Sequence, residues 1–122
     1  MPVLGSLDYL MLYAPDVAAL AGFYRDVLDG APIEEAYPDR ARLRVANIDV
    51  GLHRGTPSDG GGQPAFRVSD IAAMRAHLEA HGIVCEACEA IPGAVRMGFR
   101  DPAGNVLQVL QWGATLDSLG PQ

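Results

Sequence analysis

Hydrophobic and polar positions follow the same order in two stretches of this chain. Residues 13–20 match residues 67–74 at a constant offset: in each, an apolar run ends, an aspartate follows, and an alanine-rich pattern begins. An aspartate at this place accepts hydrogen bonds from the first free amides of a helix, so Asp16 and Asp70 predict two helix starts. The apolar spacing predicts helices over 17–28 and 71–81, each followed by a glycine.

Short runs of alternating apolar residues surround both predicted helices. One strand is predicted before each helix, over 7–14 and 63–68. Three are predicted after each, over 32–36, 41–45 and 48–53 in the first half and over 84–90, 95–100 and 105–112 in the second. Repeat one then covers about 6–54 and repeat two about 63–113, joined by a glycine-rich tether at 55–62 and followed by a loose tail at 114–122. The sequence therefore predicts one α+β domain of two βαβββ repeats, whose curved mixed sheets form a cleft.

Composition narrows the classes of function. The 122 residues are enough for one domain with its own core. A formal net charge of −6 repels phosphate backbones, which argues against a nucleic-acid partner, and it helps ligand binding only where the ligand is cationic. No apolar run reaches the roughly 18 residues of a spanning helix, and the first residues lack the pattern of a secretion signal. We therefore expect a cytoplasmic protein with no membrane partner.

Cys85 and Cys88 are too few for a disulfide framework. Their C-x-x-C spacing is half of a zinc site, and no second cysteine pair completes it. We interpret them as small apolar residues of a strand; a metal or redox role is the alternative.

A turn near the end of the chain carries a more specific signal. Residues 101–105 read Asp-Pro-Ala-Gly-Asn and precede the predicted last strand. Proline sets the turn, glycine supplies a positive φ and asparagine closes the turn. This turn resembles the D-P-x-G-N signature of the vicinal oxygen chelate superfamily, which includes glyoxalases, bleomycin-resistance proteins and ring-cleaving dioxygenases. Residues 23–28 look like the first helix of that family, and with the internal repeat the resemblance covers nearly the whole chain.

The resemblance implies a divalent metal held by His, Gln or Glu on the first, fifth and last strands, sometimes with a Glu on the fourth. The matching positions here are Tyr9, Gln63, Gln108 and, on the fourth strand, Val50. This set has no carboxylate and no imidazole, so we expect no cofactor, with a divalent metal as the alternative. Its ligands would then be Gln63 and Gln108, joined by His53 if a bulge turns that residue inward. In a regular strand His53 is expected to point away from this site.

The alternation of the strands also assigns side chains to the cleft. The expected ligand-binding residues are Tyr9, Met11, Tyr13, Gln63, Arg67, Gln108 and Leu110. Aromatic, thioether and amide groups suit an amphipathic organic ligand, and Arg67 pairs either a ligand anion or a nearby acidic residue. Trp112 either lines the rim of the cleft or packs at a dimer contact. His77 and His81 are expected to be solvated helix residues.

Three classes of function are compatible with these residues, and the third is a structural or regulatory domain. The first is a metal-independent small-molecule binding protein of the drug-resistance type, and the alternative is a metal-dependent lyase, isomerase or dioxygenase. The resemblance also implies a homodimer whose interface forms the ligand cleft. The flexible tether permits a dimer in which the two chains exchange one repeat, and equally a dimer in which each chain keeps its own two repeats together.

Overall fold

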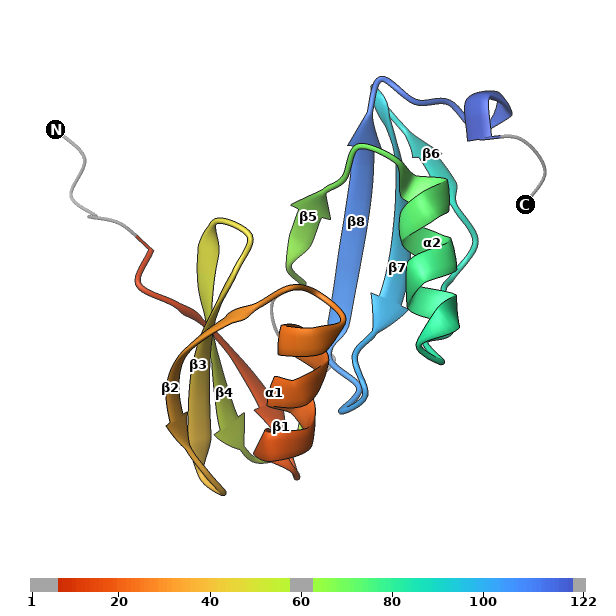
Figure 1. The fold of residues 1–122 in the computed structure, drawn as a ribbon. Helices are drawn as coiled ribbons and strands as arrows, with labels where there is room; N and C mark the ends of the chain where they lie inside the picture. The colour runs from red at the N-terminus through yellow and green to blue at the C-terminus, as the bar shows by residue number, and fades with distance from the viewer. Residues whose placement is uncertain (1–6, 58–62, 120–122) are drawn as a thin grey trace, which may run out of the picture. The chain divides into compact units, whose positions relative to one another are not determined.

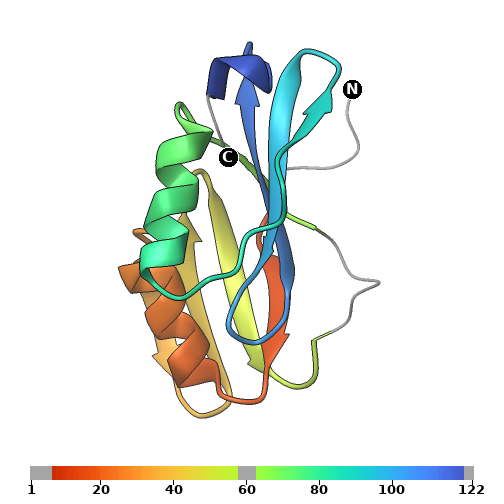
Figure 2. The ribbon, with the colours of Figure 1, turned by 90° about the vertical axis from the view of Figure 1, so that its right-hand side faces the viewer.

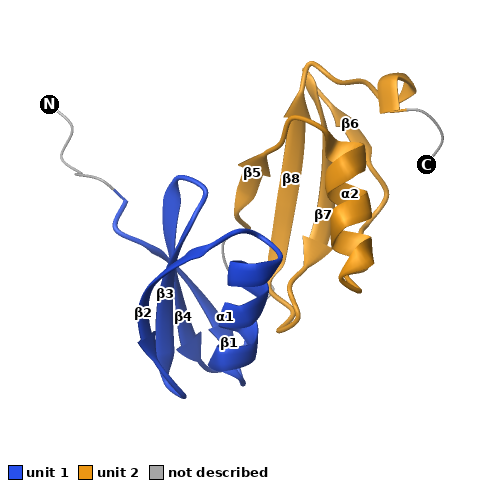
Figure 3. Ribbon diagram, in the orientation of Figure 1, with its two compact units in different colours: residues 1–58 blue, residues 59–122 orange. Residues whose placement is uncertain are grey.

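The computed structural model describes residues 7–57 and 63–119, which form two units with the same order of elements (Figures 1 and 3). Unit 1, residues 1–58, contains β1 (Leu10–Ala14), α1 (Val17–Asp26), β2 (Ala31–Ala36), β3 (Arg40–Val45) and β4 (Ile48–Arg54). Unit 2, residues 59–122, contains β5 (Ala65–Arg67), α2 (Ile71–Ala80), β6 (Glu89–Ile91), β7 (Ala94–Arg100), β8 (Val106–Trp112) and the 3-10 helix η1 (Asp117–Leu119). The predicted α+β class with two βαβββ repeats is confirmed.

Each unit has a four-stranded mixed sheet with its helix on one face. The strand orders are β1-β4-β3-β2 and β5-β8-β7-β6. In each sheet the first strand of the repeat is parallel to the last, and the other pairs are antiparallel. Helix α1 contacts β3 and β4, and α2 contacts β7 and β8, so one face of each sheet is covered and the other is open (Figure 2). Neither of these helices has the length and apolar run needed to cross a bilayer.

Both helices begin where the aspartate caps predict. The Asp16 carboxylate accepts a hydrogen bond from the Ala19 amide (3.1 Å), and the Asp70 carboxylate accepts one from the Ala73 amide (3.0 Å). Below the helices lie the two cores, one in each unit, which contain the most fully buried large side chains: Val17, Leu20, Tyr24, Leu43, Val50, Leu52, Ile71, Leu78, Val95, Met97, Leu107 and Val109.

The predicted strand over 84–90 is wrong in its first part. Only Glu89–Ile91 form a strand, and Cys85 makes an isolated bridge to Phe99. The Arg75 side chain explains the difference, because its guanidinium donates to the carbonyls of Cys85 (3.4 Å) and Glu86 (3.0 Å). These carbonyls bond to a side chain of α2 instead of to a neighbouring strand.

The ends of the repeats also differ from expectation. The expected loose tail contains η1, where the Ser118 hydroxyl donates to the Thr115 carbonyl (2.7 Å). The expected strand over 63–68 is shorter, with bounds Ala65–Arg67. Most of the predicted tether, residues 58–62, and the last residues of the tail, 120–122, lie outside the described part.

Candidate functional site

The open face of the sheet in unit 1 carries residues of β1 and β4. Cross-strand partners lie on one face of a sheet, and Met11 pairs with Gly51 while Tyr13 pairs with His53. His53 therefore shares the face of the expected cleft residues, and the expectation that it points away from them is wrong. No bulge is needed to bring it there.

The same pairing corrects the position assigned to Val50. Ala65 pairs with Gln108 in unit 2 as Met11 pairs with Gly51 in unit 1, so Gly51 is the counterpart of Gln108. Val50 is buried, 1% exposed, on the face covered by α1. The reason is loop length: residues 46–47 join β3 to β4, whereas residues 101–105 join β7 to β8. Pairing Asn47 with Asn105, the asparagines of these two turns, makes Val50 the counterpart of Gln108 and so misplaces the alignment by one residue. A shift of one residue reverses the face of every side chain in the strand.

Tyr9 lines a small cavity of about 170 Å³ on the open face of unit 1. Its ring lies over Gly51, where an added Cβ would stand 3.0 Å from Tyr9 Cδ2. The Arg42 guanidinium lies 5.0 Å from the ring centroid, a cation–π contact. His53 also lines this cavity.

Paired charges surround this cavity. The Arg42 guanidinium contacts the carboxylates of Asp8 (3.1 Å) and Asp49 (2.8 Å), and these hydrogen bonds raise the pKa of Arg42. Arg44 also hydrogen-bonds Asp49, and the bonds from Arg44 and Arg42 hold the pKa of Asp49 below its ordinary value. Because opposite charges neutralise each other here, the exposed aromatic ring of Tyr9 is the main surface available to an organic ligand.

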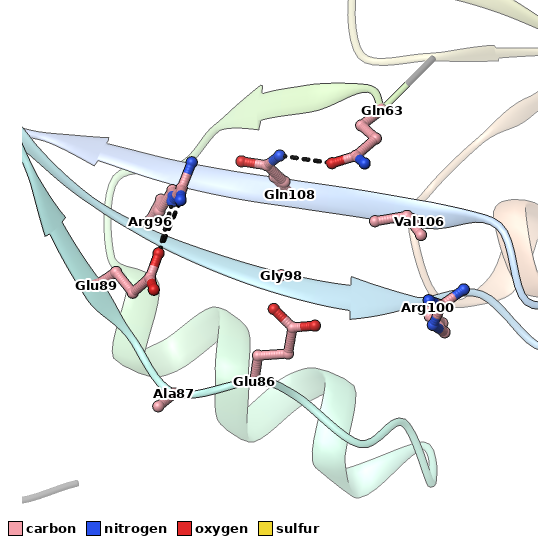
Figure 4. A pocket seen from close by; sticks show the side chains of 9 residues that line it. All are labelled: Gln63, Glu86, Ala87, Glu89, Arg96, Gly98, Arg100, Val106 and Gln108. Atoms are coloured by element: carbon pink, nitrogen blue, oxygen red, sulfur yellow. Dashed lines mark hydrogen bonds and ion pairs between the residues drawn. The ribbon is translucent and has the colours of Figure 1, made fainter. Parts of the chain in front are cut away.

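A larger cavity, of about 340 Å³, lies on the open face of unit 2 (Figure 4). Its lining residues are Gln63, Glu86, Ala87, Glu89, Arg96, Gly98, Arg100, Val106 and Gln108. The structure brings Gln63 and Gln108 together: Gln108 Nε2 donates to Gln63 Oε1 at 3.0 Å. These two amides form one wall of the cavity.

Charged residues form the rest of the wall. Arg96 donates to Glu89 Oε2 through Nε (3.0 Å) and Nη2 (2.8 Å), and Arg100 donates to the Gly104 carbonyl (2.8 Å). The Glu86 carboxylate lies over Gly98 in the middle of β7 (Figure 4). The sequence does not predict these residues as part of the site. A glycine within a strand was the available signal, because it often marks the close approach of another group.

The remaining predicted residues lie on the same two faces, outside these cavities. Arg67 is exposed and pairs with Leu110 across β5 and β8. Met11 is half-buried, and the ring of Tyr13 lies against Gly55, where an added Cβ would stand 2.9 Å from Tyr13 Cδ1. The predicted ligand set is thus divided between the open faces of the two units.

The donor atoms of these cavities do not fit a tightly held divalent ion. Within residues 7–57 and 63–119, no group of three or more His, Cys, Asp or Glu side chains is arranged to hold a metal. At the mapped positions, the oxygen of Gln63 already accepts a hydrogen bond from the amide nitrogen of Gln108. Glu86 and Glu89 also line this cavity, but Glu89 is paired with Arg96, and one remaining carboxylate with two neutral amides lacks the several charged oxygen ligands that hold a divalent ion tightly.

Cys85 and Cys88 are both free thiols, and neither lines these two cavities. Cys85 is buried, which raises its pKa, and Cys88 is half-buried. Arg75 Nη1 lies 3.9 Å from Cys88 Sγ and 3.8 Å from Met97 Sδ. Cys88 lies before β6, and Cys85 makes only an isolated bridge to Phe99. The prediction that both cysteines lie in a strand is therefore wrong.

His77, His81 and Trp112, which the sequence also singles out, are exposed. His81 Nδ1 lies 2.9 Å from the His77 carbonyl, and the two rings are 4.8 Å apart on the exposed side of α2. Trp112 is 52% exposed at the end of β8 and lies beside Gly93. None of the three lines either cavity.

Solved structures with this fold include several proteins of known description. The chain is similar to lactoylglutathione lyase from Agrobacterium tumefaciens, with a TM-score of 0.73, 23% identity, and coverage of 90% of this chain and 96% of that one. It is also similar to the fosfomycin resistance protein FosX from Listeria monocytogenes, with a TM-score of 0.78, 13% identity and coverage of 96% and 99%. A mutant of FosX complexed with Mn(II) and 1S,2S-dihydroxypropylphosphonic acid has a TM-score of 0.77 at 13% identity, with coverage of 96% of each chain. At these low identities, the likeness in structure shows a shared fold and nothing further.

Sequence comparison identifies the family. No protein with a curated description matches the sequence. The sequence profile of the Glyoxalase/Bleomycin resistance protein/Dioxygenase superfamily matches residues 6–109. This is most of the chain and includes repeat one, most of repeat two and the Asp-Pro-Ala-Gly-Asn turn. The chain belongs to this superfamily.

Proposed function

We propose that this protein binds an amphipathic organic ligand directly with side chains of its open sheet faces, without a resident divalent metal. One observation carries the proposal: Gln63 and Gln108, at positions where the family resemblance implies metal ligands, hydrogen-bond each other. A neutral amide pair has the donors and acceptors to orient an organic ligand, but it lacks the charge that holds a divalent ion.

The shapes and surfaces of the cavities support the same proposal. The unit 2 cavity, at about 340 Å³, lies within the range of roughly 300–1,000 Å³ that is usual for small-molecule sites. In unit 1 Tyr9 is 39% exposed and its ring lies over Gly51, so it offers a flat surface for stacking. Amide hydrogen bonds together with an exposed aromatic ring suit a ligand that has both polar and apolar parts.

We also propose that the binding form is a homodimer, as the family resemblance implies. Sedimentation equilibrium with and without ligand tests this part. A protein that stays monomeric at all concentrations would contradict the homodimer but would leave direct ligand binding intact.

The main test is thermal unfolding against a library of flat, amphipathic compounds, with and without a chelator. A compound at about 100 times its Kd should stabilise the protein by about 2.7 kcal/mol, and the chelator should not change this stabilisation. Tyr9→Ala should weaken ligands that stack in unit 1, and Gln108→Ala should weaken ligands that use the amide pair. Near-stoichiometric metal in the purified protein, together with loss of ligand binding in chelator, would overturn the proposal.

That opposite result would favour the second candidate, a metal-dependent lyase, isomerase or dioxygenase. FosX, which shares the fold, was crystallised as a mutant with Mn(II), and this makes the metal test the decisive one. A matched gain-of-function variant sharpens it. Gln63→His with Gln108→Glu adds an imidazole and a carboxylate, and Mn(II) should stabilise this double variant but not the wild-type protein.

A further inference from the structure

Gly98 determines where the carboxylate of Glu86 lies. The two residues are joined by a backbone hydrogen bond from the Glu86 amide to the Gly98 carbonyl (2.9 Å). A Cβ built on Gly98 would stand 2.5 Å from Glu86 Oε2 and 3.1 Å from Glu86 Cδ. The carboxylate therefore occupies the space that a side chain at position 98 would take, on the open face of β7 (Figure 4).

The Glu86 carboxylate is available to a ligand. Within the described residues, no hydrogen bond or ion pair engages it, whereas the neighbouring charges of the same cavity have partners. Arg96 is held by Glu89, and Arg100 donates to a backbone carbonyl. Since the Glu86 side chain is exposed, its charge is hydrated in the absence of a ligand and carries no large burial cost.

The opposite wall of the cavity adds neutral polar groups and an apolar surface. The amide pair of Gln63 and Gln108 supplies further hydrogen-bonding atoms, and Val106 supplies apolar contact. A carboxylate that accepts hydrogen bonds from a charged N–H donor makes one of the stronger contacts in proteins. The net charge of −6 also attracts cations toward the molecule.

We propose that Glu86 is a specificity-determining residue, which binds a protonated amine or amidinium group of an amphipathic ligand in the unit 2 cavity. The inference rests on the proposed function, because it names the class of ligand for one of the two cavities. Binding of the cation replaces water around the carboxylate, and the apolar part of the ligand lies toward Val106 and the aliphatic stems of the arginines.

Benzamidine and benzamide are a suitable pair of probes, since they have nearly the same shape and only benzamidine is cationic at neutral pH. Amide NMR titration of each into the full-length protein, up to about 10 mM, measures weak binding and locates it. We expect benzamidine to shift the amide signals of Glu86, Gly98 and Gln108, and to bind about tenfold more tightly than benzamide.

Two variants separate charge from position. Glu86→Gln removes the charge, and Gly98→Ala keeps the charge but forces the flexible carboxylate away from its place over the strand. Each should weaken benzamidine about tenfold and leave benzamide unchanged. Asp117→Asn, which removes the same charge elsewhere in unit 2, should leave both affinities unchanged.

Several results would overturn the inference. They are equal binding of the two probes, unchanged benzamidine binding in Glu86→Gln, an equal loss in Asp117→Asn, and no detectable benzamidine binding. The library screen for the proposed function also includes neutral compounds. If those compounds bind in the presence of a chelator but benzamidine binding does not depend on Glu86, the proposed function stands and the inference about cations is wrong. If the screen itself gives no ligand, the proposed function fails first.

Discussion

Replacing Asp101 with alanine should destabilise unit 2 through the turn between β7 and β8. Asp101 is only 4% exposed, and its Oδ1 accepts hydrogen bonds from the amides of Ala103 (3.0 Å) and Asn105 (2.9 Å). Its Oδ2 accepts a third, from Asn105 Nδ2 at 2.9 Å. Asn105 is itself buried at 6% exposure, so water cannot easily replace the lost acceptor.

The magnitude follows from which donors lose their partner. Two of the three donors belong to buried Asn105, and a buried donor left without a partner costs about 1–3 kcal/mol. The Ala103 amide is half-buried, and water can take over most of that bond. We therefore expect Asp101→Ala to lose about 3 kcal/mol, which for a chain of this length lowers Tm by about 10 °C.

Urea unfolding and hydrogen exchange measure this effect together. Asp101→Asn, which keeps the acceptor at Oδ1, should lose less stability than Asp101→Ala, and the Asn105 amide should exchange faster in the alanine variant. In a double-mutant cycle with Asn105→Ala, the double variant should lose less stability than the sum of the losses of the two single variants. A loss below about 1 kcal/mol for Asp101→Ala, or strict additivity in the cycle, would refute this account of the turn.

Three further predictions concern other parts of the chain. Hydrogen bonds from arginines lower the pKa of Asp49 below its ordinary 3.8. The ionised Asp49 therefore adds to the free energy of unfolding well above pH 3.8, and this contribution is lost as the pH falls through the pKa of the folded state. In urea unfolding from neutral to acid pH, Asp49→Asn should lose less stability than the wild-type protein does. Gly30→Ala should lower the free energy of unfolding, measured in urea, by about 1–3 kcal/mol, because the new Cβ would stand 2.7 Å from a backbone carbonyl oxygen of α1. Gly22→Ala should instead stabilise the protein slightly, because its Cβ meets only a side-chain atom, at 3.6 Å, and alanine favours a helix more than glycine does. Iodoacetamide followed by mass spectrometry should modify Cys88 before Cys85, since burial shields Cys85 and raises its pKa; equal rates would contradict this difference.

The sequence predicts the fold well because its signals are local and occur twice. The starts of both helices follow from the chemistry of Asp16 and Asp70, which act within their own turns. The last strand and the family follow from the turn at 101–105, whose hydrogen bonds also join near neighbours. Such short-range rules can be read from one sequence, and the structure confirms them.

The candidate site was less predictable because it depends on register and on contacts between distant residues. Val50 was placed on the wrong face, since the turns of the two repeats differ in length and one residue of misalignment reverses a strand. The place of Glu86 depends on an arginine of α2 that keeps residues 85 and 86 out of a regular strand, and on a missing side chain at Gly98. No periodicity within 84–90 indicates either contact.

Gly51 and Gly98 each leave a vacant position at the middle of an open sheet face, and a residue from outside that strand fills it. Tyr9, which precedes β1, supplies the ring in one unit, and Glu86, which precedes β6, supplies the acid in the other. The strands thus leave room at these two glycines, and the aromatic ring and the carboxylate arrive on flanking segments. Substitutions at these two flanking residues should therefore change which compounds bind, while the pairing of the strands stays the same.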